Sequence, residues 1–288
     1  MSRITFSDFS VLIIKNTFKT RFLLAKACKK VPPLAGMVNK LFFEGDDLLV
    51  LPRDGIINPP HKIEEIVINK DINVSQEDTV LPSQILKEMI MKSKYHFIMN
   101  SCICRVCSDC SDYPHNLGCL FLGKGSKKIS PKLGKPVTPQ EAMEHVSKCQ
   151  KAGLVHIVGR NKLDSFWLNT GPKEDLLTIC NCCPCCCLWK MAPDLPENMG
   201  KSFAPMIGAR IKFNQDLCIG CGKCGDNICF VDAITMDNEK VVIDIEKCRC
   251  CGRCVEVCSK GVFIMEIDAD SVENSIEHIK KLVDVELE

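Results

Sequence analysis

The sequence contains one stretch that decides the fold, Cys218-Ile-Gly-Cys-Gly-Lys-Cys-Gly-Asp-Asn-Ile-Cys229, and a second of the same kind, Cys248-Arg-Cys-Cys-Gly-Arg-Cys-Val-Glu-Val-Cys258. In each stretch three cysteines follow one another at every third position, and a fourth comes shortly after them. Three thiolates spaced in this way can hold three corners of one iron–sulfur cube, whereas the fourth serves the other cube. Zinc ribbons of the C-x2-C type would leave half of these sulfurs without a metal. The spacing therefore predicts two 4Fe-4S clusters.

Residues 208–268 resemble the bacterial two-cluster ferredoxins in these motifs and in Gly220, Gly222 and Gly252, where glycine lets the backbone bend around a cube. The resemblance implies two ββα-like half repeats and the transfer of single electrons. By motif position, it implies that one cluster is held by Cys218, Cys221, Cys224 and Cys258. The other cluster would be held by Cys248, Cys251, Cys254 and Cys229.

Three features depart from the ferredoxin pattern. Four residues, Gly225 to Ile228, stand where the family usually has three. Phe230 and Ser259 follow the terminal cysteines, where the family usually has proline. Cys250 is an extra cysteine, which we interpret as a spectator because Cys251 keeps the ligand spacing.

A second cysteine-rich region lies earlier in the chain. Each of its two loops follows an apolar, strand-like segment, so both loops can leave the same edge of a sheet and converge on one site. Three interpretations remain open: a further iron–sulfur cluster, a redox-active dithiol reduced by the ferredoxin module, and structural zinc. The redox module on the same chain favours the cluster. The candidate ligands are Cys102, Cys104, Cys107, Cys110, Cys119, Cys180, Cys182, Cys183, Cys185, Cys186 and Cys187.

Several polar residues accompany this region. Arg105 either favours thiolates and binds an anionic group, or is simply solvated. His145 and Cys149 lie at i and i+4 of a predicted helix, a spacing that can share a metal, but we interpret the pair as packing. His156 lies in an apolar segment and is interpreted as a core or site-lining histidine. The whole middle region resembles uncharacterised cysteine-rich ferredoxin-like proteins of anaerobes, and this resemblance implies no particular activity.

The composition favours a reducing compartment. The 288 residues include 22 cysteines, and the chain shows neither a secretory signal nor an 18-residue apolar run, so we expect a cytoplasmic protein. Dense cysteines in a reducing cytoplasm bind metals or act as reactive thiols. A formal net charge of +1 argues against general nucleic-acid affinity. The charge is uneven, since residues 1–40 carry eight Lys or Arg against one Asp, and residues 208–288 carry ten against sixteen Asp or Glu.

The basic front of the chain predicts an amphipathic helix. Apolar residues recur at helical spacing over residues 11–35, with basic residues between them, until Pro32 and Pro33 interrupt the pattern. We expect this helix to pack on its own domain with a solvated basic face. Membrane-surface binding and docking of an acidic partner are the alternatives.

The remaining pattern predicts an α+β fold. A helix opens near Ser83, and Thr138-Pro-Gln-Glu141 forms a capping box for another. Apolar strand-like segments precede both loops of the middle region, and prolines make residues 191–205 resemble a linker. We divide the chain into a mostly helical basic region (1–95), a Cys-rich middle region with linker (96–204), a two-cluster ferredoxin-like domain (205–270) and a C-terminal helix (271–288).

The leading functional hypothesis is an iron–sulfur electron-transfer protein. Its ferredoxin module would relay electrons to or from the middle site or a redox partner protein. The alternative is an oxidoreductase that reduces a disulfide, a thiol cofactor or a corrinoid at the middle site. A redox-sensing nucleic-acid-binding regulator is a third hypothesis, because the elements expected over residues 82–180 follow the order of a winged helix. No P-loop, G-x-G-x-x-G, G-x-S-x-G or H-E-x-x-H motif supports nucleotide, flavin or hydrolase chemistry.

Overall fold

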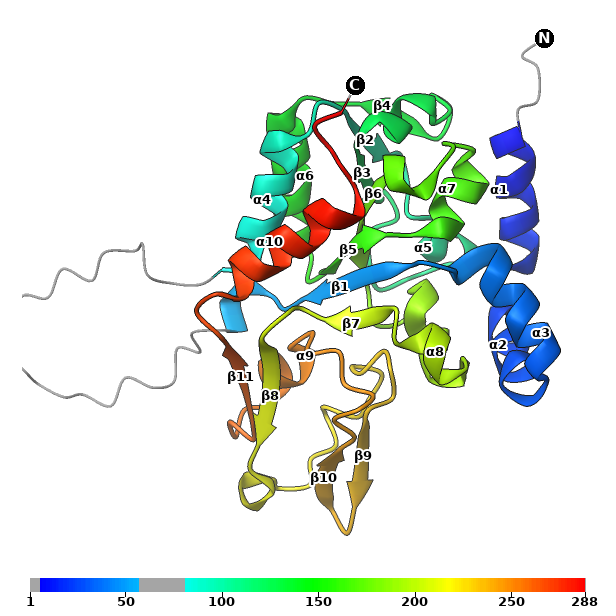
Figure 1. Ribbon diagram of the computed structural model, residues 1–288. Helices are drawn as coiled ribbons and strands as arrows, with labels where there is room; N and C mark the ends of the chain where they lie inside the picture. Colours follow the sequence, from blue (N-terminus) through cyan, green and yellow to red (C-terminus); the bar gives the residue numbers. More distant parts are fainter. Residues whose placement is uncertain (1–5, 57–80, 288) are drawn as a thin grey trace, which may run out of the picture.

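The computed structural model describes residues 6–56 and 81–287 and shows the predicted α+β fold (Figure 1). A seven-stranded sheet forms its centre, with the strand order β4-β2-β3-β6-β5-β1-β7. Neighbouring strands run antiparallel except β1 and β7, which run parallel. The strands are β1 (Asp47–Leu51), β2 (His96–Met99), β3 (Leu120–Leu122), β4 (Gly134–Pro136), β5 (Val155–Arg160), β6 (Leu177–Cys182) and β7 (Phe203–Pro205).

Three helices cover one face of the sheet: α4 (Ser83–Lys92), α6 (Pro139–Lys151) and α10 (Ser271–Leu282) (Figure 1). The apolar side of α4, made by Ile85, Leu86, Met89 and Ile90, is fully buried in this layer. The predicted capping box of α6 is also present, because Thr138 and Glu141 each accept a hydrogen bond from the other's backbone N–H. The pattern of these helices therefore gave both their starting points and their buried sides.

Other helices and turns cover the opposite face of the sheet and lie next to the cysteines. The front of the chain supplies most of them, and the others follow β2, β5 and β6. They are α1 (Phe6–Thr17), η1 (Phe18–Thr20), α2 (Arg21–Lys30), α3 (Pro32–Val38), the π-helical turn η2 (Asn39–Phe43), α5 (Ile103–Cys107), α7 (Lys162–Leu168), η7 (Leu188–Asp194) and α8 (Glu197–Gly200). Short 3-10 turns complete the main body at η3 (Asp54–Ile56), η5 (Lys124–Lys128) and η6 (Lys173–Asp175).

Residues 206–270, called the C-terminal cysteine part below, extend from the edge of this body that carries β7 (Figure 1). They contain two antiparallel strand pairs, β8 with β11 and β9 with β10. The first and last strands of the part thus pair with each other, and a hairpin lies between them. The elements are β8 (Ala209–Phe213), η8 (Gln215–Leu217), β9 (Ile234–Asp237), β10 (Lys240–Ile243), α9 (Arg253–Val257) and β11 (Phe263–Ile267).

The structure corrects the predicted linker at residues 191–205. This stretch contains part of η7, the short helix α8 and the edge strand β7, which pairs with β1. Met191, Met199 and Phe203 are buried in the core next to the sheet. Its prolines suggested a linker, but the apolar side chains between them are held by β1, a strand far away in the sequence. The sheet also spans the boundary that we placed after residue 95, because β1 lies before it, β5 lies after it, and the two strands pair with each other.

The front of the chain forms three helices where the sequence predicted one. The chain turns through η1 between α1 and α2, and Pro32 and Pro33 begin α3, since proline is tolerated in the first turn of a helix. Phe18 and Cys28 are buried as expected, whereas Leu23 is 72% exposed. The winged-helix order expected over residues 82–180 is also wrong, because this range supplies five strands, β2 to β6, of the seven-stranded sheet.

Asp46, just before β1, gives a testable pH dependence of stability. Its carboxylate accepts a hydrogen bond from the backbone N–H of Lys162 (2.7 Å), but burial raises its pKa from 3.8 to about 7. A carboxyl whose pKa is higher in the folded state makes stability fall as the pH rises from about 4 to about 7. Asp46→Asn can still accept this hydrogen bond. We therefore expect it to raise the free energy of unfolding at pH 8 by at most about 4 kcal/mol, because one pKa unit is worth about 1.4 kcal/mol.

Anaerobic denaturant unfolding at pH 5 and pH 8 measures this effect. Glu44→Gln is the matched control, because Glu44 lies two positions away and its side chain is 58% exposed. Glu44→Gln should leave the free energy of unfolding nearly unchanged at both pH values. An Asp46→Asn variant that is less stable than the parent at pH 8 would contradict the prediction.

Candidate functional site

The C-terminal cysteine part encloses two cavities, and each is lined by one set of four predicted ligand cysteines. Each set combines three cysteines from one motif with the last cysteine of the other motif. These are the two sets that the ferredoxin resemblance implies. The outer cavity is lined by Cys218, Cys221, Cys224 and Cys258. The inner cavity is lined by Cys229, Cys248, Cys251 and Cys254, and the extra cysteine Cys250 lines it as a fifth.

Two glycines shape the loops around these cavities. Gly220 has a φ of +71° and Gly252 a φ of +81°, a region that side chains with a Cβ rarely adopt. A Cβ at Gly220 would also meet the backbone oxygen of Glu239, and one at Gly252 would overlap Ile56. The extra residue in the first motif is accommodated in the same way, because Asn227 adopts a left-handed conformation (φ +54°).

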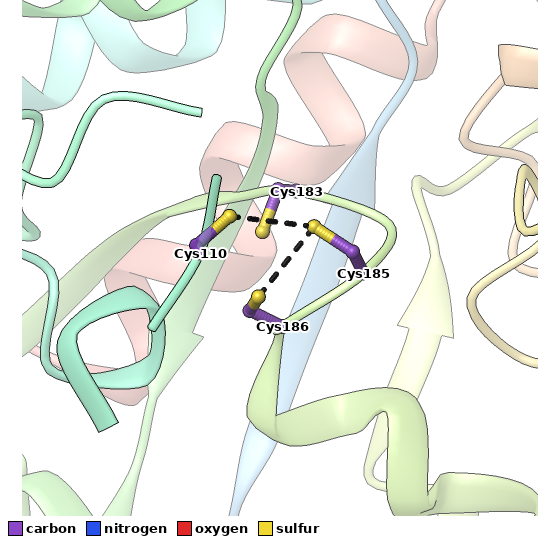
Figure 2. Close-up of side chains that lie close together, drawn as sticks. All are labelled: Cys110, Cys183, Cys185 and Cys186. Atoms are coloured by element: carbon purple, nitrogen blue, oxygen red, sulfur yellow. Dashed lines mark hydrogen bonds between the residues drawn. The ribbon is translucent and has the colours of Figure 1, made fainter. Parts of the chain in front are cut away.

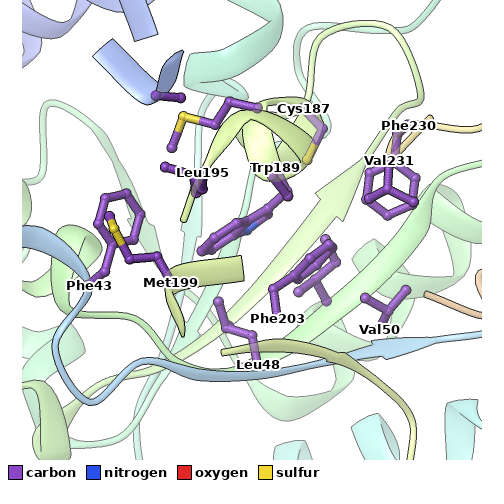
Figure 3. Packing of buried hydrophobic residues seen from close by; sticks show 14 of the residues in the cluster. Phe43, Leu48, Val50, Cys187, Trp189, Leu195, Met199, Phe203, Phe230 and Val231 are labelled. Carbon is purple, nitrogen blue, oxygen red and sulfur yellow. The ribbon is translucent and has the colours of Figure 1, made fainter. Parts of the chain in front are cut away.

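Phe230 explains one departure from the ferredoxin pattern. It is buried against Phe203 of β7 (ring centroids 5.6 Å), which stacks on Trp189 of η7 (4.9 Å) (Figure 3). Proline at position 230 could not fill this space. The aromatic residue therefore anchors the C-terminal cysteine part to the sheet, and the inner cavity lies on the anchored side because Cys229 and Cys251 pack against the same core.

Strand β6 divides the sequence Cys180-Asn-Cys-Cys-Pro-Cys-Cys-Cys187 between two places. Alternate residues of a strand point to opposite faces, so Cys180 and Cys182 face the core that holds Trp189, and Asn181 faces away. The chain turns after Cys182 and returns at Cys187, the residue before η7. Cys183, Cys185 and Cys186, which lie between them in the sequence, belong to a different group of thiols. The thiol of Cys187 contacts the thiol of Cys182.

The other loop joins this group from the end of β2. Both β2 and β6 run antiparallel to β3, so they end at the same edge of the sheet and the predicted convergence of their loops is confirmed. The Sγ atoms of Cys119 and Cys180 are 3.8 Å apart, and Cys102 and Cys104 contact each other at the start of α5. The resulting six-thiol group consists of Cys102, Cys104, Cys119, Cys180, Cys182 and Cys187.

Four other cysteines form a separate, tighter group (Figure 2). Cys110, Cys183, Cys185 and Cys186 have their sulfur atoms within 4.8 Å of one another, so they could hold a metal ion. The Sγ of Cys185 is 3.6 Å from that of Cys110 and 3.5 Å from that of Cys186. We call this the tetrathiol group. Cys107, at the end of α5, is half-buried near Lys15 and Arg21, and burial raises its pKa.

Arg105 places a buried positive charge beside both groups. It is fully buried and donates hydrogen bonds to the backbone oxygens of Asn181 (2.9 Å) and Leu117. Burial opposes its charge, but nearby thiols that include Cys102 and Cys183 outweigh this effect and raise its pKa. No carboxylate in the described ranges forms a salt bridge with it. The solvated interpretation of Arg105 is therefore wrong, because its side chain is fully buried beside these thiols.

The thiols of the six-thiol group can supply this negative charge. Hydrogen bonds from Cys180 and Cys187 hold the pKa of Cys182 well below its usual range, and Arg105 and Arg253 lower it further. The Cys104 thiol similarly lowers the pKa of Cys102 to about 7. Thiolates are the form in which cysteine binds metals. Soft sulfur donors around a buried cation without a carboxylate thus fit a metal–thiolate centre.

Arg253 links the six-thiol group to the inner cavity. It is only 6% exposed and donates a hydrogen bond to the backbone oxygen of Cys182 (2.8 Å). Burial raises the pKa of Cys251 to about 11, and the charge of Arg253 opposes this rise. One guanidinium group therefore serves a cysteine of each site, and the sequence reasoning had not identified it.

A cavity of about 380 Å³ opens onto the six-thiol group from the helical front of the chain. Five of the six cysteines line it, all except Cys102, and its walls are mostly apolar side chains of α1, α2, α7 and η7. Among its polar groups, Arg21 rests on the rings of Phe18 (3.9 Å) and Phe22 (4.2 Å). The sequence gave no sign of this cavity, because its walls come from segments far apart in the chain.

The histidines near the site are structural. His145 shares a hydrogen bond with the backbone oxygen of Gly118 (2.8 Å), and its Nε2 is 3.7 Å from the Cys149 sulfur. Burial lowers the pKa of His156 to about 4 and raises that of Cys149 to about 12, so both groups are neutral. His156 pairs with the side chain of Asn181 (2.8 Å). The packing interpretation of His145 and Cys149 therefore fits the structure.

No family model, curated protein or solved structure matches this chain. Among the described residues, no helix is long and apolar enough to cross a membrane. What the geometry establishes is a cysteine-rich α+β protein with a group of four thiols that could bind a metal.

Proposed function

We propose that the protein is an iron–sulfur electron-transfer protein. The cysteines of the outer and inner cavities would each hold a 4Fe-4S cluster, and the six-thiol group would hold a further cluster. Bound clusters supply one-electron transfer, with potentials set by charge, hydrogen bonds and exposure. The observation that carries the proposal is that neighbouring cysteine sets pack against shared cores, the outer with the inner cavity and the inner cavity with the six-thiol group.

The series runs from the surface to the interior. Cys221 of the outer cavity is exposed, as is its neighbour Ile219. Cys229 of the inner cavity packs against the core that also contacts Cys180 and Cys182. A redox partner protein can therefore meet the chain at the outer cavity, while the six-thiol group is shielded by the helical front.

Iron and sulfide analysis of the anaerobically purified full-length protein tests the proposal. Two 4Fe-4S clusters account for about eight iron and about eight sulfide atoms, so the protein should contain more than about eight of each, and a redox titration followed by EPR should resolve a third signal. About eight iron atoms and only two signals would contradict the further cluster. No acid-labile sulfide would contradict the whole proposal.

Arg253→Gln should change two of the three potentials. Because Arg253 is close to Cys251 and Cys182, its charge favours the reduced, more negative state of a cluster at either place. We expect the midpoint potentials of the inner and six-thiol clusters to fall by roughly 60 mV, a tenfold change in equilibrium constant for one electron. The outer cluster should keep its potential.

Arg210→Gln is the control for this experiment. Arg210 lies on β8, its side chain is 53% exposed, and it pairs with Asp268 and Glu266 on the surface. It should leave all three potentials unchanged. Equal shifts of all three signals in Arg253→Gln, or no shift at all, would mean that Arg253 does not act at a shared boundary.

The cavity favours a second candidate function, an oxidoreductase with its substrate at the six-thiol group. A volume of about 380 Å³ is at the lower end for ligand pockets. It suits a small, mainly apolar disulfide or thiol compound better than a corrinoid. Mixing the reduced protein with a small aromatic disulfide tests this function: oxidation of the clusters with release of two thiols for every two electrons supports it, and stable reduced clusters oppose it.

A further inference from the structure

We propose that the tetrathiol group is a separate site for one soft divalent ion, zinc or iron, and is not part of the six-thiol centre. The eleven cysteines of the middle region would then serve two different purposes. This inference does not depend on electron transfer, because it rests on the arrangement of Cys110, Cys183, Cys185 and Cys186 alone.

The sulfur spacing of the tetrathiol group fits a single ion. Four thiolates at about 2.3 Å from one zinc ion in a tetrahedron lie about 3.8 Å from one another. Here all four sulfurs lie within 4.8 Å of one another, with 3.6 Å between Cys110 and Cys185. Thiolates on a 4Fe-4S cube lie farther apart, because each binds a different iron. In the inner and outer cavities, accordingly, the cysteines surround a space and do not form such a tight group.

The chain itself keeps the tetrathiol group apart from the six-thiol group. Strand β6 ends at Cys182, which packs against the core that holds Trp189. Cys183, Cys185 and Cys186 lie in the loop that follows and meet Cys110 there (Figure 2). Cys183 and Cys186 are buried, and the group packs with Cys149, Leu154, Leu117 and Tyr113. The 380 Å³ cavity is not lined by any of the four cysteines.

The site has the features of a structural metal centre. Four protein sulfurs complete the coordination of a tetrahedral ion and leave no open position for a substrate. The site joins two loops that are far apart in the sequence, since Cys110 and Cys185 are 75 positions apart. The Cys110 loop is further fixed by a hydrogen bond between its backbone oxygen and the His115 ring (2.8 Å). An ion here would therefore hold in place the two loops that also carry the six-thiol group.

Metal and sulfide analysis of full-length Cys110→Ala tests this inference. A single-ion site contains no inorganic sulfide, so the variant should lose about one metal ion per chain, zinc or iron, and no sulfide. The iron–sulfur EPR signals should remain. Cys149→Ala is the matched control, because Cys149 is a buried, neutral thiol in the same small core and is not one of the four. It should keep the full metal content.

X-ray absorption of the unaltered protein gives a second test that does not require a folded variant. The ion at this site should show four sulfur neighbours at about 2.3 Å and no second metal nearby. If zinc occupies it, the zinc edge alone reports the site, and if iron does, a mononuclear tetrathiolate signature adds to the cluster iron. Loss of several irons together with sulfide in Cys110→Ala, or an unchanged metal content, would overturn the proposal.

Discussion

Cys182→Ala should abolish the third iron–sulfur signal and reduce the iron content to that of the ferredoxin-type clusters, about eight atoms, plus any iron of the tetrathiol site. Cys182 occupies the centre of the six-thiol group, since its thiol contacts Cys180 and Cys187 and it lies near both Arg105 and Arg253. Both ferredoxin-type signals should persist, because their cysteines lie on other loops. EPR-monitored titration and iron analysis measure the effect.

The neighbouring cysteine Cys185 provides the informative comparison. Although it is only three positions away, it belongs to the tetrathiol group, so Cys185→Ala should leave the third signal and the sulfide content intact. Cys149→Ala controls for the loss of a buried thiol. If Cys182→Ala and Cys185→Ala lost the same signal, the two groups would form one centre and the assignment of the six-thiol group would be wrong.

Arg105→Met should destabilise the loaded protein more than the metal-free protein. In the loaded protein, removal of the cation leaves a buried anionic centre without compensation, which costs about 3–5 kcal/mol for a buried pair. We expect this loss in the free energy of unfolding, together with loss of iron from the middle site. In the metal-free protein Cys102 and Cys182 can take up protons when the cation is removed, so the same change should cost less stability.

Anaerobic denaturant unfolding of both forms measures this difference. Arg105→Lys retains the charge but cannot reach the carbonyl oxygens of both Asn181 and Leu117, so it should fall between the parent and Arg105→Met. Equal destabilisation of the loaded and metal-free forms by Arg105→Met would show that Arg105 contributes only packing and hydrogen bonds.

Local patterns predicted the parts of the fold that depend on neighbouring residues. The buried side of α4 and the capping box at Thr138 follow from periodicity and residue type within one helix. Cysteine spacing likewise indicated which residues would share each cavity of the C-terminal cysteine part. The apolar segments before both loops indicated the convergence of β2 and β6, because both strands end at the cysteines.

The features that the sequence analysis did not predict depend on contacts between residues far apart in the chain. The short strand β7 forms because it pairs with β1, which is far away in the sequence. The residues of 191–205 give no sign of this pairing, and their prolines therefore suggested a linker. The division of the Cys180–Cys187 run depends on where β6 ends, which no residue in the run marks clearly. The alternating positions of Cys180 and Cys182 could have indicated that these two cysteines share one face of a strand and are separate from the cysteines that follow. The burial of Arg105 depends on the carbonyl groups of Asn181 and Leu117, and the charge alone could not show it.

The C-terminal cysteine part is fastened to the main body at both of its ends. Residues 206–208 join β7 directly to β8, and residues 268–270 join β11 to α10, whose Ile279 is buried beside α4. A domain on one flexible tether must diffuse before its redox centre meets a partner. With two short connections and Phe230 held in the core, no such search is needed. The separation between Cys251 and Cys182 is then set by the fold of the chain and does not depend on a diffusional encounter between two domains.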